Sequence, residues 1–202
     1  MDAITQAKWD KVAPNFDVMA GRGAEDRWQP SKETLFSHME GKILFLALGT
    51  GLDIPTFPNG KTITAIDISS KMLEVAQPRL AAYDGEIQAQ LMDVHDMSFE
   101  DNSFDQVFTS CTFCSVPRPV DGLRQLRRVL KPGGELFMFE HTGSSYYPFK
   151  SMMNLMTILT SKIGPDMNRT TVANVEEAGF QLREVNNLFL DVVKIIKAVN
   201  PC

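Results

Sequence analysis

The chain has 202 residues, a length typical of a single domain. Hydrophobic residues make up 44% of it, enough for a substantial core without disulfide bonds. Twenty Lys and Arg against twenty-five Asp and Glu give a net charge of −5, which argues against a wide nucleic-acid-binding surface, because phosphate binding needs clustered positive charge.

The sequence also indicates where the protein is found. Its longest apolar stretches, residues 43–48 and 152–159, are shorter than the roughly 18–20 residues that span a bilayer. The amino terminus is polar and has no apolar signal core, so we expect a cytoplasmic protein with reduced cysteines. Cys111 and Cys114 form a CxxC pair, but the sequence has only one other cysteine and three scattered histidines, so we predict no metal site.

Residues 1–40 differ from the rest of the chain in their pattern. A short helix is predicted from about Asp2 to just before Pro14, and Gly-Arg-Gly at 21–23 predicts a turn. We expect this segment to form a helical cap over the open end of a sheet.

From residue 42 onward, short apolar runs alternate with helical stretches, which is typical of a parallel sheet wrapped by crossover helices. Strands are predicted at residues 42–48, 62–67, 86–91, 104–110 and 135–140. Helices are predicted at residues 70–81, 120–130 and 170–178. The chain is therefore expected to form one α/β domain, with a core at 41–202 behind the cap.

Two apolar runs at the carboxyl end, residues 180–185 and 188–199, are separated only by Asn186 and Asn187. Such short spacing predicts a hairpin, so at least one neighbour in the sheet should be antiparallel.

Residues suited to nucleotide binding follow several predicted strands. The first strand runs into Gly49-Thr50-Gly51, and the second ends at Asp67. Asp93 follows the third strand. In a doubly wound sheet, a glycine turn approaches the ligand backbone and a carboxylate on the neighbouring strand reaches a ribose diol.

The motifs at these strand ends resemble those of the class I S-adenosylmethionine (SAM) methyltransferases. They are ALGTG at 47–51, AIDIS at 65–69, MDVHDMSF at 92–99, FDQVFTS at 104–110 and LRRVLKPGGELFMFEH at 126–141. The resemblance implies a Rossmann-like fold with a mostly parallel seven-stranded sheet and an antiparallel carboxyl-terminal hairpin. It also implies SAM as cofactor and S-adenosylhomocysteine as product.

The resemblance assigns cofactor contacts residue by residue. The glycine turn would cradle the methionine part of SAM, Asp67 would hold the ribose, and Asp93 with Val94 would meet the adenine. The full set of expected cofactor residues is Gly49, Thr50, Gly51, Asp67, Ile68, Met72, Asp93, Val94 and Ser110.

Two positions depart from the family pattern. Phe45 stands where the family usually has an acid that helps to hold the methionine ammonium, and Ala47 stands at the usual first glycine. We expect Asp53, just after the turn, to substitute for the missing acid.

Within this family, the segments at 9–17, 49–55 and 111–134 are similar to the bacterial phosphatidylethanolamine N-methyltransferases. This resemblance implies a phospholipid acceptor methylated towards phosphatidylcholine. The alternatives are carbon methylation of a quinone precursor and methylation of a small thiol. More remote alternatives are a non-catalytic nucleotide-binding protein and an NAD-dependent dehydrogenase, although Ile54 replaces the third glycine that a dehydrogenase motif requires.

An amine acceptor must lose a proton before methyl transfer, so the site needs a base. His141 is the first candidate, and Tyr146 and Tyr147 would orient the amine. Aromatic residues that could face a cationic headgroup are Phe16, Trp28 and Phe113. Cations available for a lipid phosphate are Arg22, Arg118, Lys150 and Arg169.

A lipid acceptor implies reversible docking on the inner, anionic face of a membrane. Residues 1–20 and the methionine-rich stretch at 149–163 are the expected contact segments. Alternatively, residues 1–20 close the SAM site and the apolar stretch fills the core. The oligomeric state is left open.

Overall fold

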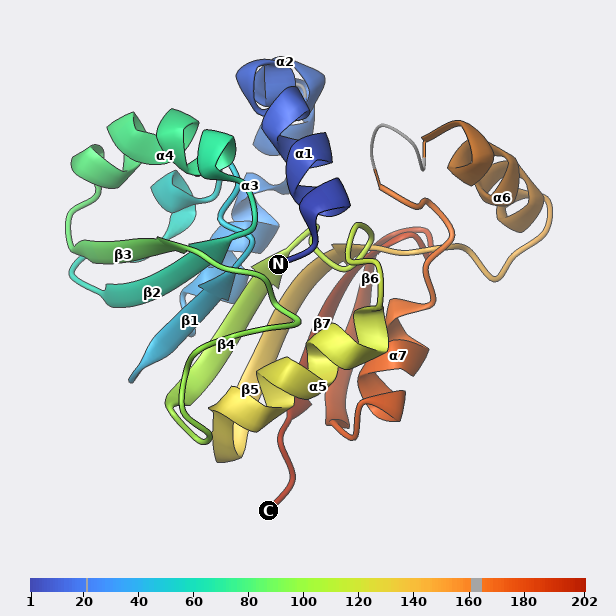
Figure 1. Ribbon diagram of the computed structural model, residues 1–202. Helices are drawn as coiled ribbons and strands as arrows, with labels where there is room; N and C mark the ends of the chain where they lie inside the picture. The colour runs from blue at the N-terminus through green and yellow to red at the C-terminus, as the bar shows by residue number, and fades with distance from the viewer. Residues whose placement is uncertain (21, 161–164) are drawn as a thin grey trace.

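The computed structural model describes residues 1–20, 22–160 and 165–202, which form a seven-stranded sheet flanked by helices (Figure 1). The strands are β1 Ile43–Leu46, β2 Thr62–Asp67, β3 Glu86–Leu91, β4 Phe104–Ser110, β5 Leu130–His141, β6 Gln181–Phe189 and β7 Val193–Val199. Their spatial order is β3-β2-β1-β4-β5-β7-β6.

Strands β1 to β5 are mutually parallel, and β7 is antiparallel to both of its neighbours. The order of the parallel strands reverses between β1 and β4, where ligands of open α/β sheets bind. This topology confirms the predicted Rossmann-like methyltransferase fold.

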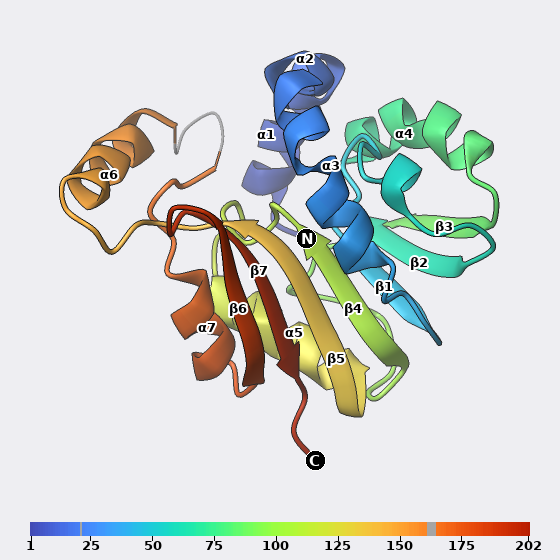
Figure 2. The same ribbon diagram turned by 180° about the vertical axis from the view of Figure 1, so that it is seen from behind.

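Helices cover both faces of the sheet. They are α1 Ala3–Val12, α2 Phe16–Ala20, α3 Arg22–Phe36, α4 Ser70–Ala82, α5 Pro119–Val129, α6 Phe149–Thr160 and α7 Thr171–Glu177, with 3₁₀ turns η1 Ala13–Asn15 and η2 Ile54–Thr56. One core layer joins α5 and α7 to the sheet through Leu123, Leu126 and Val175. The opposite layer joins α3 and α4 through Phe36 and Ala76 (Figure 2).

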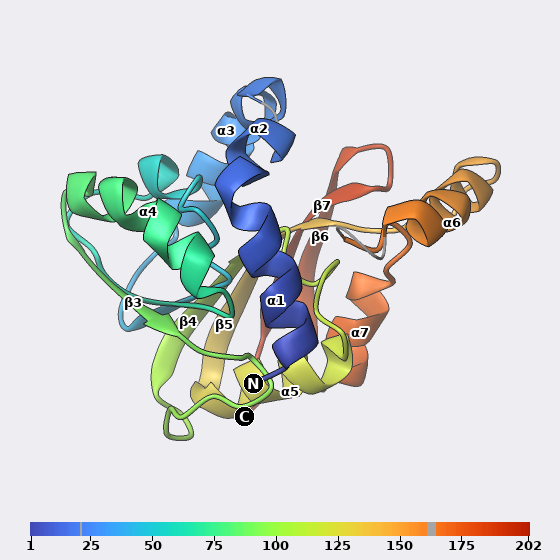
Figure 3. The same cartoon turned by 45° about the horizontal axis from the view of Figure 1, so that its top comes forward.

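Helix α1 lies above the carboxyl ends of the strands, as Figure 3 shows. Asp2 caps α1 by accepting hydrogen bonds from the Ile4 and Thr5 amides. The predicted turn at 21–23 is wrong for its last two residues, because Arg22 and Gly23 belong to α3; Gly21 lies outside the described residues.

Two of the parallel strands differ from their predicted bounds. β1 ends at Leu46 rather than at residue 48, because Ala47 adopts a left-handed conformation with φ of 57°. β5 begins at Leu130 rather than Glu135, because Leu130 already pairs with Phe104.

The hairpin forms, but its turn is not at Asn186 and Asn187. Both asparagines belong to β6 and pair with residues of β7. Asn187 also accepts a hydrogen bond from Lys194 Nζ on β7 at 2.6 Å. The chain reverses around Asp191 instead, whose carboxylate accepts hydrogen bonds from Ser144 Oγ and the Ser145 amide, both at 2.6 Å. Contacts with the loop after β5 therefore place the turn.

Helix α6 stands apart from the sheet (Figures 1 and 2). Most of its large apolar side chains are exposed; among them Leu155 is 62% and Ile158 is 69% exposed, whereas Met153 is buried. In the described part of the chain, every helix is too short or too polar to cross a bilayer.

Candidate functional site

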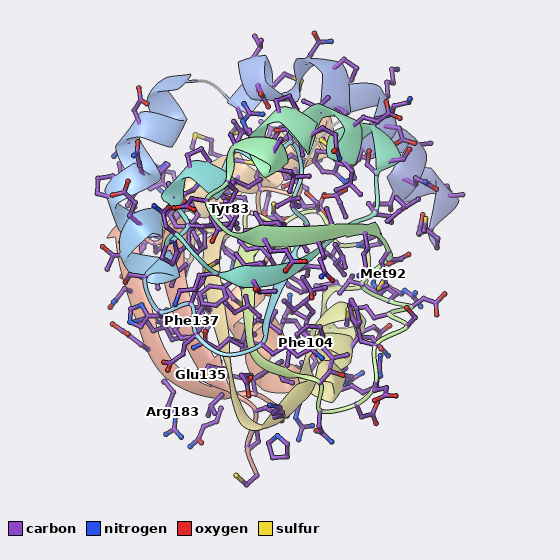
Figure 4. The ribbon with its side chains drawn as sticks, turned by 90° about the vertical axis from the view of Figure 1, so that its left-hand side faces the viewer. Tyr83, Met92, Phe104, Glu135, Phe137 and Arg183 are labelled. Atoms are coloured by element: carbon purple, nitrogen blue, oxygen red, sulfur yellow. The ribbon has the colours of Figure 1, made fainter. Side chains whose placement is uncertain are left out.

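A cavity of about 360 Å³ lies over the carboxyl ends of the parallel strands, beneath the amino-terminal helices. Its size falls within the range of small-molecule sites, about 300–1,000 Å³. Met92, at the carboxyl end of β3 in Figure 4, is one of its lining residues. Of the residues predicted to bind cofactor or acceptor, those that line it are Phe16, Trp28, Gly49, Thr50, Asp53, Asp67, Ile68, Met72, Asp93, Val94, Ser110 and His141.

The glycine turn after β1 leaves space for a ligand. Gly49 and Gly51 have φ of 61° and 79°, a conformation that favours glycine. A Cβ on Gly49 would meet no atom within 4 Å, whereas one on Gly51 would lie 2.8 Å from Ile54 Cδ1. Gly49 therefore borders open space, and Gly51 allows close packing behind the turn.

Asp67 connects this turn to the end of β2. Its carboxylate accepts hydrogen bonds from the Gly49 amide at 2.7 Å and the Ser69 amide at 2.8 Å. Burial raises the pKa of Asp67 above its ordinary value, while these amide hydrogen bonds act in the opposite direction. A carboxylate held this way suits a ribose diol, since two lone pairs on each oxygen allow further hydrogen bonds.

Asp93 follows β3 at the same edge. Burial would raise the pKa of its carboxyl group, but hydrogen bonds from the His95 and Asp2 amides outweigh burial and lower it. His95 Nδ1 also lies 2.9 Å from Asp93 Oδ1. Asp93 is thus an ionised hydrogen-bond acceptor, and one of its oxygens already accepts a hydrogen bond from the Asp2 amide at the start of α1.

The amino-terminal cap is fixed to the other strand ends by acidic side chains. Asp10 accepts a hydrogen bond from Ser69 Oγ, and Asp17 accepts one from Thr50 Oγ1, both at 2.6 Å. Arg79 on α4 forms an ion pair with Asp17 at 2.7 Å. The cap therefore contacts the residues that border the cofactor positions.

The opposite end of the cavity is mainly aromatic and apolar. Trp28 packs against Phe139 with ring centroids 6.0 Å apart, and His141 and Val193 lie in register on β5 and β7. His141 Nδ1 is buried and has no hydrogen-bond partner among the described residues. Burial also lowers the pKa of His141, so its imidazole is neutral at pH values near 7.

The structure places several predicted acceptor residues outside the cavity. Tyr146 and Tyr147 are 67% and 84% exposed, because the chain leaves the sheet after β5 on its way to α6. Phe113 packs entirely within the core.

The described side chains that were predicted to bind a phosphate group also lie outside the cavity. Arg118 and Lys150 are exposed, and Arg169 forms an ion pair with Asp166 at 2.6 Å. The side chain of Arg22 lies outside the described part of the structure.

Three further residues stand out at or beside the cavity, and of these sequence analysis missed Lys32 and Glu140. Lys32 on α3 lines it and forms an ion pair with Asp53, with 2.8 Å between Nζ and Oδ1. Cys111 also lines it, and desolvation raises the pKa of its thiol well above the ordinary value, so the thiol is neutral. Glu140, the residue that precedes His141 in the sequence, is fully buried. Neither hydrophobic periodicity nor a motif in the sequence indicates that Lys32 faces inward, so its place in the cavity could not be predicted.

Glu140 fixes the loop after β4. It accepts hydrogen bonds from Thr109 Oγ1 at 2.8 Å, the Thr112 amide at 3.2 Å and the Phe113 amide at 3.1 Å. Burial raises the pKa of Glu140 from 4.5 to about 7, despite these hydrogen bonds.

This raised pKa predicts a stability that depends on pH. Between pH 4.5 and about 7 the native state binds more protons at Glu140 than the unfolded state, so the free energy of unfolding falls as pH rises. At about 1.4 kcal/mol per pKa unit, the loss is about 3 kcal/mol. Urea unfolding at about pH 5 and about pH 8 should show this loss in the native protein and a smaller one in Glu140→Gln.

Glu135→Gln is the matched control, because Glu135 lies on the same strand but is exposed. It should keep the native pH dependence. Identical pH dependence in all three proteins would contradict the prediction.

Among the described residues, no group of three or more His, Cys, Asp and Glu side chains is arranged to hold a metal ion.

The known proteins that the sequence resembles are methyltransferases. A family model described as a methyltransferase domain matches residues 44–138. The chain is 31% identical over 157 residues to the ubiquinone/menaquinone biosynthesis C-methyltransferase UbiE of Geotalea daltonii, covering 73% of this chain and 67% of that protein. It is 29% identical over 221 residues to the demethylmenaquinone methyltransferase of Clavibacter sepedonicus, covering 96% and 89%. It is 27% identical over 126 residues to the phosphatidylethanolamine N-methyltransferase of Cereibacter sphaeroides, covering 61% and 62%.

Solved structures share the fold at low sequence identity. The [4+2]-cyclase SpnF superposes with a TM-score of 0.74 at 16% identity, covering 97% of this chain and 94% of that one. A Haemonchus contortus phosphoethanolamine N-methyltransferase in complex with phosphomonomethylethanolamine and S-adenosylhomocysteine superposes with a TM-score of 0.65 at 19% identity. The match covers 87% of this chain and 53% of that one.

Proposed function

The chain belongs to the SAM-dependent methyltransferases, and from this premise we propose that it methylates a ring carbon of a reduced isoprenoid-quinone precursor. The observation that carries the proposal is the aromatic end of the cavity, where His141 is neutral and its buried Nδ1 has no partner among the described residues. The similarity to the Clavibacter demethylmenaquinone methyltransferase, which extends over 96% of this chain, supports the same acceptor class.

The residues around the glycine turn fit SAM as cofactor. Gly49 borders open space, and the carboxylates of Asp67 and Asp93 lie at successive strand ends. When bound, SAM supplies an electrophilic methyl group that needs no further activation. The remaining task of the protein is to make the acceptor nucleophilic.

For a hydroquinone acceptor, this task is the removal of a phenolic proton, whose pKa is about 10 by analogy with tyrosine. The neutral imidazole of His141 accepts the proton, which leaves an aryl oxide with negative charge on the ortho ring carbon. Bound SAM would supply the methyl group to that carbon. The ring would then release its C–H proton to water, and the imidazolium of His141 would return its proton to the oxygen.

The composition of the cavity favours this acceptor over phosphatidylethanolamine. Trp28 and Phe139 line this end of the cavity, so an aromatic acceptor bound there would contact aromatic rings. Among the described lining residues, Lys32 is the only Lys or Arg, and it pairs with Asp53. A phosphodiester would need a cation that the predicted Arg118, Lys150 and Arg169 do not bring to this cavity.

Methyl transfer from labelled SAM tests the proposal directly. We expect label in the ring of reduced demethylmenaquinone, because its free hydroxyl group can be deprotonated. The 1,4-dimethoxy derivative is the matched control, since it has the same ring and tail but no acidic proton, and it should take up no label. Label in phosphatidylethanolamine or a small thiol, with none in the hydroquinone, would overturn the proposal.

A lipid-soluble acceptor also requires access from a membrane, and α6 offers a surface for this contact. It carries exposed Leu155 and Ile158, and exposed Val18 and Met19 lie on α2 at the same end of the molecule (Figure 1). We propose that these two helices contact the bilayer. In the same assay, Leu155→Asp should slow methylation of vesicle-bound acceptor more than methylation of detergent-dispersed acceptor.

A further inference from the structure

An ion pair inside the cavity wall has no part in the chemistry described so far. Lys32 Nζ lies 2.8 Å from Asp53 Oδ1, and the two side chains are only 6% and 13% exposed. Both residues line the cavity. Because burying two charges costs solvation free energy, apolar side chains would join α3 to the loop after β1 at least as well. The position of this pair therefore points to a ligand.

The order of the strands gives the position of the pair along the cavity. Asp93 follows β3, Asp67 ends β2, and the glycine turn follows β1, so these features lie in a row. Asp53 comes just beyond this turn, and Lys32 Nζ lies 5.3 Å from the ring centre of Phe139 on β5. The ion pair is thus on the opposite side of the glycine turn from Asp67 and Asp93.

The two ends of SAM differ in charge. Its nucleoside end matches Asp67 and Asp93, and its other end is an amino acid with one ammonium and one carboxylate group. Such a zwitterion requires an anion and a cation side by side, which Asp53 and Lys32 provide. The position where the family usually has an acid for this end holds Phe45, which is fully buried in the core.

We propose that Asp53 binds the α-ammonium group of SAM and that Lys32 binds its α-carboxylate group. The inference rests on SAM as cofactor and is independent of the proposed acceptor. It also explains how the chain tolerates Phe45: the missing negative charge is supplied by the loop after the glycine turn, and α3 adds the matching positive charge.

Calorimetric binding of three probes, without acceptor, tests the inference. The probes are SAM, decarboxylated SAM, which lacks the carboxylate, and 5′-methylthioadenosine, which lacks the whole amino-acid end. The native protein should bind SAM about 10- to 100-fold more tightly than decarboxylated SAM, because a hydrogen bond to a charged group is lost. Lys32→Met should remove this preference.

Asp53→Asn, which preserves side-chain shape, should weaken binding of both SAM and decarboxylated SAM but keep the preference between them. Affinity for 5′-methylthioadenosine should stay within about twofold in both variants, since that probe makes none of these contacts. Lys32→Arg keeps the charge and should keep the preference for SAM.

Lys131→Met is the matched control, because it breaks the exposed Lys131–Asp105 ion pair of 2.6 Å outside the cavity. It should leave the affinities for all three probes unchanged. Equal affinity of the native protein for SAM and decarboxylated SAM would overturn the inference. So would an equal loss for SAM and 5′-methylthioadenosine in both variants, because the ion pair would then only hold α3 in place.

Discussion

Replacing His141 by glutamine should lower kcat about 10²- to 10⁴-fold, the range typical of removing a general base. The affinity for S-adenosylhomocysteine should stay within about twofold, because His141 lies on β5 at the aromatic end of the cavity, away from Asp67 and Asp93. Steady-state kinetics and calorimetry on the same preparations separate the two effects.

The pH dependence provides a second measurement. Burial lowers the pKa of His141, so the neutral base predominates at pH 6.5 and above, and native activity should fall only as the pH drops below that value. In His141→Gln only the spontaneously ionised acceptor reacts, so its residual rate should rise about tenfold per pH unit up to about pH 9.

His38→Gln is the matched control, since His38 is exposed and its Nδ1 contacts the carbonyl groups of Thr34 and Leu35 in the last turn of α3. It should behave like the native protein. Near-native turnover of His141→Gln over the whole pH range would remove His141 as the base.

The fold and the cofactor end of the site could be predicted because they depend on local backbone patterns. A glycine turn after a buried strand and an aspartate at the end of the next strand come together in any parallel sheet of this order. Gly49, Asp67 and Asp93 accordingly line one cavity.

The acceptor end was less predictable, because it depends on which way side chains point from segments that are distant in sequence. Tyr147 follows His141 by six residues, but the chain has already left the sheet at that point, and the tyrosine is exposed. Lys32 faces the cavity only because α3 packs beside the loop that carries Asp53. The hairpin turn also lies at a different place from the predicted one because of contacts between distant segments. Ser144 and Ser145, in the loop after β5, donate hydrogen bonds to Asp191.

Replacing Asp67 by asparagine should raise the Kd for S-adenosylhomocysteine by about 10²- to 10⁴-fold. The estimate corresponds to the loss of two hydrogen bonds from ribose hydroxyl groups to a charged acceptor, at about 1.5–3 kcal/mol each. The substitution also places an amide NH₂ where the carboxylate accepts hydrogen bonds from the Gly49 and Ser69 amides, so the glycine turn loses one support.

These two consequences of Asp67→Asn can be separated by measuring the thermal midpoint without ligand together with the Kd. A buried carboxylate whose pKa is raised by desolvation contributes little to stability at neutral pH, so the midpoint should change by only a few degrees. Asp84→Asn removes the same charge from an exposed loop and should alter neither quantity. A Kd for Asp67→Asn within about threefold of the native value would contradict the ribose contact, because the loss of even one charged hydrogen bond exceeds that change.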